Sequence, residues 1–418
     1  MVLTDSIILL RNTIDRLSIN EALNKGHAPH PEDYVYLAGS SGATEAIQSA
    51  IQTIKNPKTI TIKWDGYPAL IFGRGTDGQF SIMDKHMFNK KDGTGRAVYS
   101  PEQFAQYDAA RGVNRSDLAV LINQIWAGLE ESSANAIGYY WGDLLFSKPL
   151  IEQNGVYVFK ANPNGITYTV QADSSVGKLI KNKTAGIAVH QYIPPGAITT
   201  DDASSLDGKL GQLKNISNVA ILPSAMPQAP NLKIDSTLLA NAQSEIKNHG
   251  AELDSLLANA PGASFKEGLV GVYFNKKIRE GNLNNLLNGF YDYSFRAKAA
   301  KIAKEQTAIL QKKDPNAAAV IPEQPNDFIA SRPMTAPMKS KVEQHLNTHK
   351  AGLIALFKIW VSIYKLKMDI WKKLDDSAKS SPVQGQLDDG TAGQEGFVAN
   401  GFKYVNRMGF SRQNFAAR

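Results

Sequence analysis

The sequence predicts an α+β protein in which a sheet-rich core is interrupted by a long helical segment. Between residues 59 and 192, short apolar runs alternate with polar residues, and turn residues separate them, which is the pattern of strands joined by hairpins. From about 232 to 378, apolar residues recur every three or four positions, which favours helices. The alternation returns at 394–407 around Asn400-Gly401, so a terminal hairpin is expected to complete the core.

These patterns divide the 418 residues into three segments. Residues 1–205 form the core with its N-terminal helices, 206–390 form a helical insertion, and 391–418 form the hairpin that completes the core. Helices are predicted at 4–22, 42–55, 101–130, 235–258, 264–280, 284–313 and 335–376. A Gly/Ser/Asp-rich linker is expected from Ser380 to Gly393.

Composition excludes several classes of protein. The chain has no cysteine, which removes disulfides, thiolate metal sites and cysteine nucleophiles. It has no 18-residue uncharged run, and no basic segment precedes its apolar start, so we expect a protein that crosses no membrane and stays in the cytoplasm, the host's cytoplasm if it is viral. A net charge of +7 permits a polyanionic partner without requiring one.

The stretch from Thr59 to Gly73 carries the first candidate residue. Isoleucines alternate with polar residues up to Lys63, a turn follows at Asp65-Gly66, and a second apolar strand continues to Gly73. An amine at the end of a strand is well placed to act as a nucleophile, provided that partial burial or nearby cations lower its pKa from about 10.4. A surface lysine before a tight turn is the plain alternative.

Two later strands end in charged residues. The alternating run from Gln79 ends at Lys85 and enters a basic loop, where Lys85 is a candidate phosphate contact or a solvated side chain. An aromatic strand from Gly138 is expected to reach a turn at Gly142-Asp143, with a second apolar strand leaving it.

Two tyrosines are candidates to stack on a base. Tyr168 lies in a hairpin that turns at Asn162-Pro163-Asn164-Gly165, and Tyr192 lies in the strand at 186–192. Either ring offers a stacking face, and either is equally suited to core packing.

The helical insertion carries cations beside aromatic residues. This composition suits a nucleic-acid surface, and it equally suits a solvated helical face over an aromatic core. The cations include Arg296, Lys298, Lys301, Lys304, Lys350, Lys358, Lys365, Lys367, Lys372 and Lys373, and the aromatics include Tyr291, Tyr293, Phe295, Trp360, Tyr364 and Trp371.

The terminal hairpin supplies a carboxylate and an amine on neighbouring strands. Glu395 begins the first strand, and Lys403 lies on the returning strand. Glu267 stands in a similar Glu-Gly-hydrophobic-Val sequence, but the apolar residues around it recur at helical spacing. The spacing therefore places Glu267 on a helix and Glu395 on a strand.

In chain order, these segments resemble the motifs of the covalent nucleotidyltransferases, the superfamily of polynucleotide ligases and RNA-capping enzymes. Lys63-Trp64-Asp65-Gly66 matches the Lys-x-Asp-Gly signature, and Gly142-Asp143 resembles the third motif, where glutamate is commoner. Glu395-Gly-Phe-Val resembles the fourth motif, and Phe402-Lys403-Tyr404 resembles the fifth. The similarity covers roughly 59–192 and 394–410, and it extends to uncharacterised ligase-like proteins of tailed bacteriophages.

The resemblance implies an antiparallel-sheet ligase-type core that uses ATP and Mg²⁺. Lys63 would be adenylated, with Gly66 beside the nucleotide, and Asp65 and Glu395 would support the metal and the ribose. Further contacts to the nucleotide are implied for Lys85 and Lys403 at the phosphates, for Asp143 at the ribose or metal, and for Tyr168 or Tyr192 at the base. AMP would then pass to a 5′-phosphorylated RNA or DNA end, and a 3′-hydroxyl would displace it.

Two departures from the family pattern bear on this expectation. Only 15 residues follow Lys403, so no C-terminal oligonucleotide-binding (OB) barrel is expected, and an insertion of about 190 residues separates the third and fourth motifs. RNA is favoured over DNA because Asp65-Gly66 is not followed directly by Xaa-Arg. The alternatives are a non-catalytic phage structural or nucleic-acid-binding protein with this fold, and an adenylyltransferase acting on a protein or small molecule.

Overall fold

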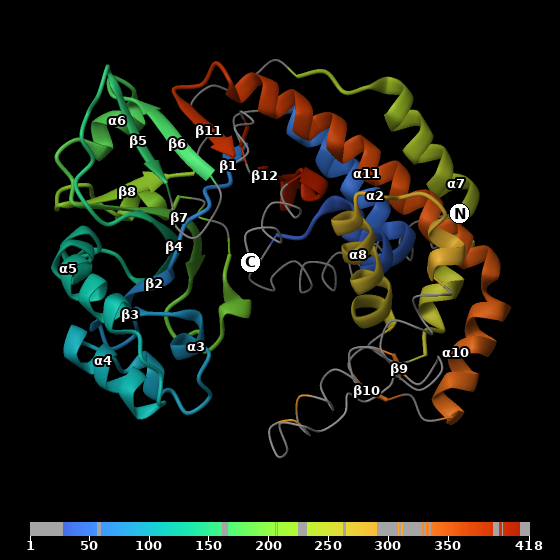
Figure 1. The fold of residues 1–418 in the computed structure, drawn as a ribbon, viewed down its shortest axis with the longest axis horizontal. Helices are drawn as coiled ribbons and strands as arrows, with labels where there is room; N and C mark the ends of the chain where they lie inside the picture. Colours follow the sequence, from blue (N-terminus) through green and yellow to red (C-terminus); the bar gives the residue numbers. More distant parts are fainter. Residues whose placement is uncertain are drawn as a thin grey trace, which may run out of the picture. The chain divides into compact units, whose positions relative to one another are not determined.

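A computed structural model describes most of the chain, and within it two compact units. The described residues are 28–56, 60–160, 166–204, 206, 208–224, 232–261, 265–290, 308, 311, 328–329, 332–333, 336–387, 393–394 and 396–409. The sheet unit contains residues 53–232 and 371–405, and the helical unit contains 29–52, 233–370 and the chain from 406. The fold is therefore of mixed α and β structure, as predicted (Figure 1). The predicted N-terminal helix at 4–22 lies outside the described residues.

A five-stranded sheet forms the larger part of the sheet unit, in the order β3-β2-β4-β7-β8. The strands are β2 (Ala69–Arg74), β3 (Phe80–Met83), β4 (Gly138–Phe146), β7 (Ala185–Ile193) and β8 (Val219–Pro223). All neighbours are antiparallel except β7 and β8, which are parallel. Strand β7 confirms the strand predicted at 186–192, whereas β8 was not predicted. The turn expected at Gly142-Asp143 is wrong, because β4 runs through it and a register shift after Trp141 accommodates the irregularity.

Two smaller sheets complete the sheet unit. One has the order β1-β12-β13 and the other β11-β6-β5. Their strands are β1 (Thr61–Ile62), β5 (Val156–Lys160), β6 (Ile166–Gln171), β11 (Val383–Leu387), β12 (Gly396–Ala399) and β13 (Phe402–Val405). The predicted terminal hairpin is confirmed, and Asn400 and Gly401 both adopt positive φ, as its tight turn requires. The linker expected at 380–393 instead contains β11, which pairs with β6 and buries Val383.

Helices pack on the five-stranded sheet and make its core. The predicted helix at 101–130 consists of α4 (Pro101–Ala110) and α5 (Ser116–Ser132). Ile122, Ile125 and Leu129 of α5 are buried against Phe80 and neighbouring sheet residues. Shorter elements are α3 (Lys85–Phe88), α6 (Ser175–Ile180), η3 (Thr94–Arg96), η4 (Thr200–Asp202) and η5 (Leu210–Gln212).

The helical unit follows the predicted 3.6-residue period. Its elements are η1 (Pro31–Asp33), most of α2 (Tyr34–Lys55), α7 (Ser236–Ala258), a π-helix η6 (Phe265–Gly271), α8 (Val272–Glu280), α10 (Ala336–Thr348), most of α11 (Lys350–Ala378) and two short strands, β9 (Phe328–Ile329) and β10 (Arg332–Pro333). The helices predicted at 235–258 and 264–280 are confirmed, whereas 335–376 is divided at His349. Of the helix predicted at 284–313, only 286–290 is described as a continuous helical run.

Helix α2 begins earlier than the predicted residue 42 and is kinked at Gly39, which has φ 69°. The carboxylate of Asp254 accepts hydrogen bonds from the Ser40 backbone N–H (2.8 Å) and the Ser40 hydroxyl (2.5 Å). A Cβ at Gly39 would lie 2.3 Å from Asp254 Oδ1, so glycine is required there. The backbone N–H that follows the kink is thus bound by a protein carboxylate, which acts as an ordinary cap.

An aromatic stack and a buried ion cluster hold the helical unit together. Trp360 lies between Phe274 and Tyr364, with ring centroids 4.1 and 5.2 Å away. Lys367 Nζ lies 2.8 Å from Glu32 Oε1, and both side chains are fully buried. Arg407 bridges Glu32 and Asp33, at 2.9 Å from each. No helix among the described residues is long and apolar enough to cross a membrane.

Candidate active site

Lys63 follows the last residue of β1 and is joined to the terminal hairpin. Its backbone N–H donates to the carbonyl of Gly396 at 2.9 Å. Its Nζ lies 3.9 Å from Asp65 Oδ1, and the two side chains are 25% and 17% exposed. The amine therefore sits in a largely desolvated position beside a carboxylate, while a quarter of its surface remains accessible to a reactant.

Aromatic residues fix the loop that carries Lys63. Trp64 is buried, packs against Tyr168 (centroids 4.8 Å apart) and Phe159 (6.5 Å), and donates from Nε1 to the carbonyl of Pro223 at 3.2 Å. The Tyr168 hydroxyl accepts a hydrogen bond from the backbone N–H of Asp65 at 2.8 Å. These contacts hold the chain after Lys63, and the pairing of β1 with β12 holds the chain before it, which limits the conformations of the amine.

Gly66 allows the loop to rest directly on β4. A Cβ at Gly66 would lie 2.4 Å from the backbone oxygen of Leu144, closer than any real side chain approaches. The next residue, Tyr67, donates its backbone N–H to the same oxygen at 2.9 Å. Glycine at this position is therefore a packing requirement that brings Lys63 and Asp65 close to the strand carrying Asp143.

Asp143 lies on β4 opposite Ala69 of β2, and it has a partner that sequence reasoning missed. His190 of β7 places Nε2 3.5 Å from Asp143 Oδ2, and both side chains are partly buried. Asp143 pairs with Ala188, so His190 lies two residues further along on the same face. No local signal in the sequence identifies this pair, because the register between β4 and β7 creates it.

Lys85 is the first residue of α3, so the prediction that it begins a basic loop is wrong. The side chain of Asp84 caps α3 by accepting from the backbone N–H of Met87 at 2.7 Å. Lys85 Nζ lies 5.3 Å from the ring centroid of Trp141, and the same ring is 5.7 Å from His190. The Trp141 ring is therefore close both to the Lys85 cation and to His190 of the Asp143–His190 pair.

The terminal hairpin brings Lys403 into the sheet that ends at Lys63. Thr61, Val398 and Lys403 are aligned across β1, β12 and β13, and all three are partly exposed. The next row, Ile62, Phe397 and Tyr404, is buried. Lys403 therefore lies on the accessible face that also carries Thr61. Glu395, predicted as its partner, lies outside the described residues.

The two candidate stacking residues are both in the core. The Tyr168 ring is fully buried between Trp64 and Phe159, and its hydroxyl is the atom that reaches the Lys63 loop. Tyr192 is 7% exposed and donates its hydroxyl to the carbonyl of Ile137 at 2.9 Å. In this structure, neither ring offers an open face to a base, so burial favours the core-packing alternative for both.

The chemistry of the site is compatible with Mg²⁺. Among the described residues, no group of three His, Asp or Glu side chains forms a ready metal cage. Proteins usually hold Mg²⁺ through one or two carboxylates together with substrate phosphates. Asp65 supplies one such carboxylate beside Lys63.

The nucleic-acid surface expected on the helical insertion is partly wrong. Lys367 is buried in the ion cluster with Glu32, where burial lowers the pKa of the lysine. Trp360 and Tyr364 belong to the buried aromatic stack. Lys350, Lys358, Lys365 and Lys372 remain exposed. The cations and aromatics between Tyr291 and Lys304 lie outside the described residues.

Comparison with known proteins gives a family and no function. No curated protein and no solved structure matches the chain. One family model, described as a family of unknown function (DUF6267), matches residues 24–418. Because this match spans nearly the whole chain, the protein belongs to the family of unknown function DUF6267.

Proposed function

We propose that this protein is an ATP-dependent nucleotidyltransferase that forms a lysyl-AMP on Lys63 and transfers the nucleotide to a 5′-phosphorylated RNA or DNA end for sealing. The observation that carries the proposal is the hydrogen bond between Lys63 and Gly396 at 2.9 Å. It joins the segment that carries the candidate nucleophile to the hairpin that carries Lys403. The proposed reaction needs both amines, Lys63 to attack the phosphate and Lys403 to offset its charge.

The first step forms one bond and breaks one. Deprotonated Lys63 Nζ attacks the α-phosphorus of ATP, a P–N bond forms, the nitrogen releases one proton to the solvent, and pyrophosphate leaves with the electrons of the broken P–O bond. Lys403 and Lys85 offset the negative charge that develops on the phosphates. Asp65, with Glu395, would hold Mg²⁺, which supplies further neutralisation of phosphate charge when bound.

The remaining steps regenerate the amine. An oxygen of the 5′-phosphate attacks the phosphorus of the lysyl-AMP, the P–N bond breaks, and Lys63 regains a proton. The 3′-hydroxyl then attacks the activated 5′-phosphate, a phosphodiester bond forms, and AMP leaves. Asp143, oriented by His190 at 3.5 Å, is suited to accept hydrogen bonds from the ribose hydroxyls.

Labelling with α-³²P ATP or GTP and Mg²⁺, followed by denaturing electrophoresis, tests the first step. We expect an adduct from ATP that Lys63→Ala and Lys63→Arg both abolish, because arginine keeps the charge and stays protonated. Lys148→Ala, a change at an exposed lysine in the same unit, is the matched control and should label fully. An adduct that survives both Lys63 changes would remove Lys63 as the nucleophile.

The acceptor is tested by a chase of the purified adduct. Transfer of the label to 5′-phosphorylated RNA, but not to 5′-hydroxyl RNA, would support strand sealing. The same chase with 5′-phosphorylated DNA shows whether the acceptor is RNA or DNA. Label that passes only to a protein or small molecule would favour the adenylyltransferase alternative. Absence of any adduct with either nucleotide would favour the non-catalytic binding protein.

A further inference from the structure

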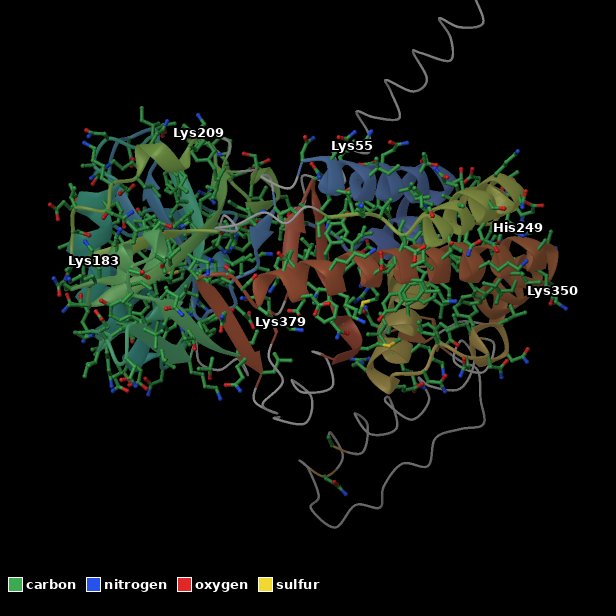
Figure 2. All side chains as sticks on the ribbon, turned by 90° about the horizontal axis from the view of Figure 1, so that it is seen from above. Lys55, Lys183, Lys209, His249, Lys350 and Lys379 are labelled. Carbon is green, nitrogen blue, oxygen red and sulfur yellow. The ribbon has the colours of Figure 1, made fainter. Side chains whose placement is uncertain are left out.

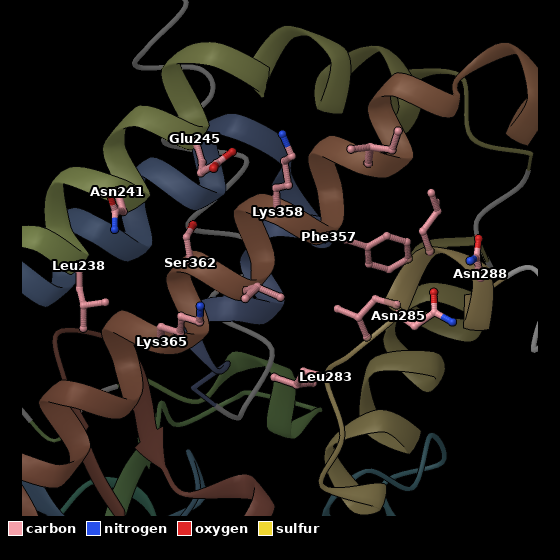
Figure 3. Close-up of a pocket in the computed structure, with 14 residues that line it drawn as sticks. Leu238, Asn241, Glu245, Leu283, Asn285, Asn288, Phe357, Lys358, Ser362 and Lys365 are labelled. Carbon is pink, nitrogen blue, oxygen red and sulfur yellow. The ribbon is translucent and has the colours of Figure 1, made fainter.

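The helical unit contains a groove that no step of the proposed reaction uses. Its volume is about 710 Å³, and it lies between α7, α11 and the segment 283–288 (Figure 3). Pockets of a few hundred to about 1,000 Å³ hold ligands of the size of a nucleotide. All residues that line it belong to the helical unit, so its geometry is defined within one compact part of the molecule.

Two cations from α11 line the groove. Lys358 and Lys365 are exposed and seven positions apart, so they lie on the same side of the helix about 10 Å apart along its axis. Lys358 Nζ is 3.2 Å from His249 Nε2, and Ser362 lies between the two lysines with its hydroxyl donated to the carbonyl of Ile359 at 2.8 Å. The two lysines are suited to successive anionic groups of one extended ligand.

Amide groups and apolar side chains supply the rest of the lining. Asn241 comes from α7, and Asn285 and Asn288 come from the opposite segment (Figure 3). Each carboxamide presents a donor and an acceptor together, as the edge of a nucleobase does. Leu287, Ile354 and Val361, all partly exposed, form an apolar surface beside these amides.

We propose that this groove binds a nucleobase that carries phosphate, with the phosphates on Lys358 and Lys365 and the base against Leu287 and Val361 beside the asparagine amides. A free nucleotide and one unit of a single strand share this chemistry. The groove uses none of the residues around Lys63, so the proposal goes beyond the proposed transfer reaction and its test is independent of it.

One carboxylate in the groove lining predicts the direction in which ligand affinity changes when its charge is removed. Glu245 of α7 lies on the groove wall, with Oε2 3.5 Å from His249 Nε2. A carboxylate beside a phosphate site opposes anion binding. Removal of this charge by Glu245→Gln should therefore strengthen binding of an anionic ligand, whereas a groove that serves only packing gives no such gain.

The experiment uses the full chain with Lys63→Ala, which prevents transfer, and fluorescence anisotropy of a labelled single-stranded RNA of about ten nucleotides. Lys358→Ala with Lys365→Ala should weaken binding about tenfold and lower the salt slope by about one to two. The control is Lys247→Ala with Lys341→Ala, which removes the same charge from exposed positions outside the groove lining. This control leaves Lys350, one of the candidate nucleic-acid cations, in place (Figure 2). Circular dichroism and melting temperature establish that both double variants are folded.

Competition by AMP distinguishes the two sources of the ligand. If AMP displaces the RNA from the Lys63→Ala chain, and if the Lys358/Lys365 variant loses this affinity for AMP, the groove is a mononucleotide site. If RNA binds and AMP does not compete with it, the groove is a strand site. Equal RNA binding by the groove and control variants, or no gain with Glu245→Gln, overturns the proposal. Since binding is measured without adenylation, failure of the Lys63 reaction leaves this result interpretable.

Discussion

The hydroxyl of Tyr168 accepts a hydrogen bond from the backbone N–H of Asp65 at 2.8 Å, so a strand in one sheet fixes the loop that carries the candidate nucleophile. Tyr168 is fully buried and its ring packs on Trp64. The hydroxyl oxygen of Tyr168 thus connects the core of the sheet unit to the loop that positions Lys63.

The substitution Tyr168→Phe tests this link. It keeps the ring and leaves the Asp65 N–H without the hydroxyl, so we expect a loss of about 1 kcal/mol in the free energy of unfolding. We also expect adduct formation to slow about tenfold, because the loop is less well held. Tyr157→Phe, on the neighbouring strand β5, is the control and should keep the wild-type labelling rate. Equal rates in the two variants would contradict the positioning role.

The substitution Gly66→Ala tests the close approach to β4. The added Cβ would meet the backbone oxygen of Leu144 at 2.4 Å, and a backbone atom has little freedom to move away. We expect a loss of about 2 kcal/mol in stability and severely reduced adduct formation. Gly211→Ala is the matched control, because a Cβ there meets nothing within 4 Å. Urea denaturation and labelling of both variants make the comparison, and a neutral Gly66→Ala would show that the loop is not held against β4.

The substitution Lys367→Met tests the buried ion cluster. It leaves the Glu32 carboxylate with Arg407 alone, and we expect a loss of about 3 kcal/mol in the stability of the helical unit. Adding Glu32→Gln should restore part of that loss, because the uncompensated charge is gone. Chemical denaturation of the two single variants and the double variant gives the coupling. Additive effects would mean that the two groups do not interact in solution.

The same cluster predicts a pH dependence. Burial alone raises the pKa of Glu32, but Lys367 and Arg407 outweigh it and hold that pKa below its ordinary value. Because the folded-state pKa is the lower one, the carboxylate contributes its stabilisation fully above the unfolded value of about 4.3 and loses it as the pH falls. The stability difference between wild type and Glu32→Gln should therefore shrink on acidification from pH 6 toward pH 3. A constant difference across this range would contradict the lowered pKa.

One lysine substitution and one glutamate substitution test whether the terminal hairpin belongs to the active site. Lys403→Ala should severely reduce adduct formation, because Lys403 is aligned with Val398 and Thr61 in the sheet that leads to Lys63. Glu267→Ala should be nearly silent, since Glu267 is exposed on the helical element Phe265–Gly271, as its spacing predicted. The labelling assay measures both variants. A reversal of the two effects would show that the terminal hairpin is only an edge of the sheet.

The sequence by itself determined the elements whose signals are local. A continuous apolar run predicted β2, alternating residues predicted β3 and the terminal hairpin, and the three-to-four spacing predicted α7 and α8. The Asn400-Gly401 pair predicted a tight turn, because few other residues adopt positive φ at low cost. The order of the candidate residues along the chain was also readable without a structure.

Only the tertiary structure decided which distant residues meet. The Asp143–His190 pair depends on the register between β4 and β7, and the Lys63–Gly396 contact depends on the pairing of β1 with β12. Lys367 carries the sequence signal of a surface cation, yet it is buried because Glu32, far away in the sequence, offers it a carboxylate. Local periodicity encodes how a segment folds, whereas burial of a charge and strand register depend on partners that the neighbouring residues do not specify.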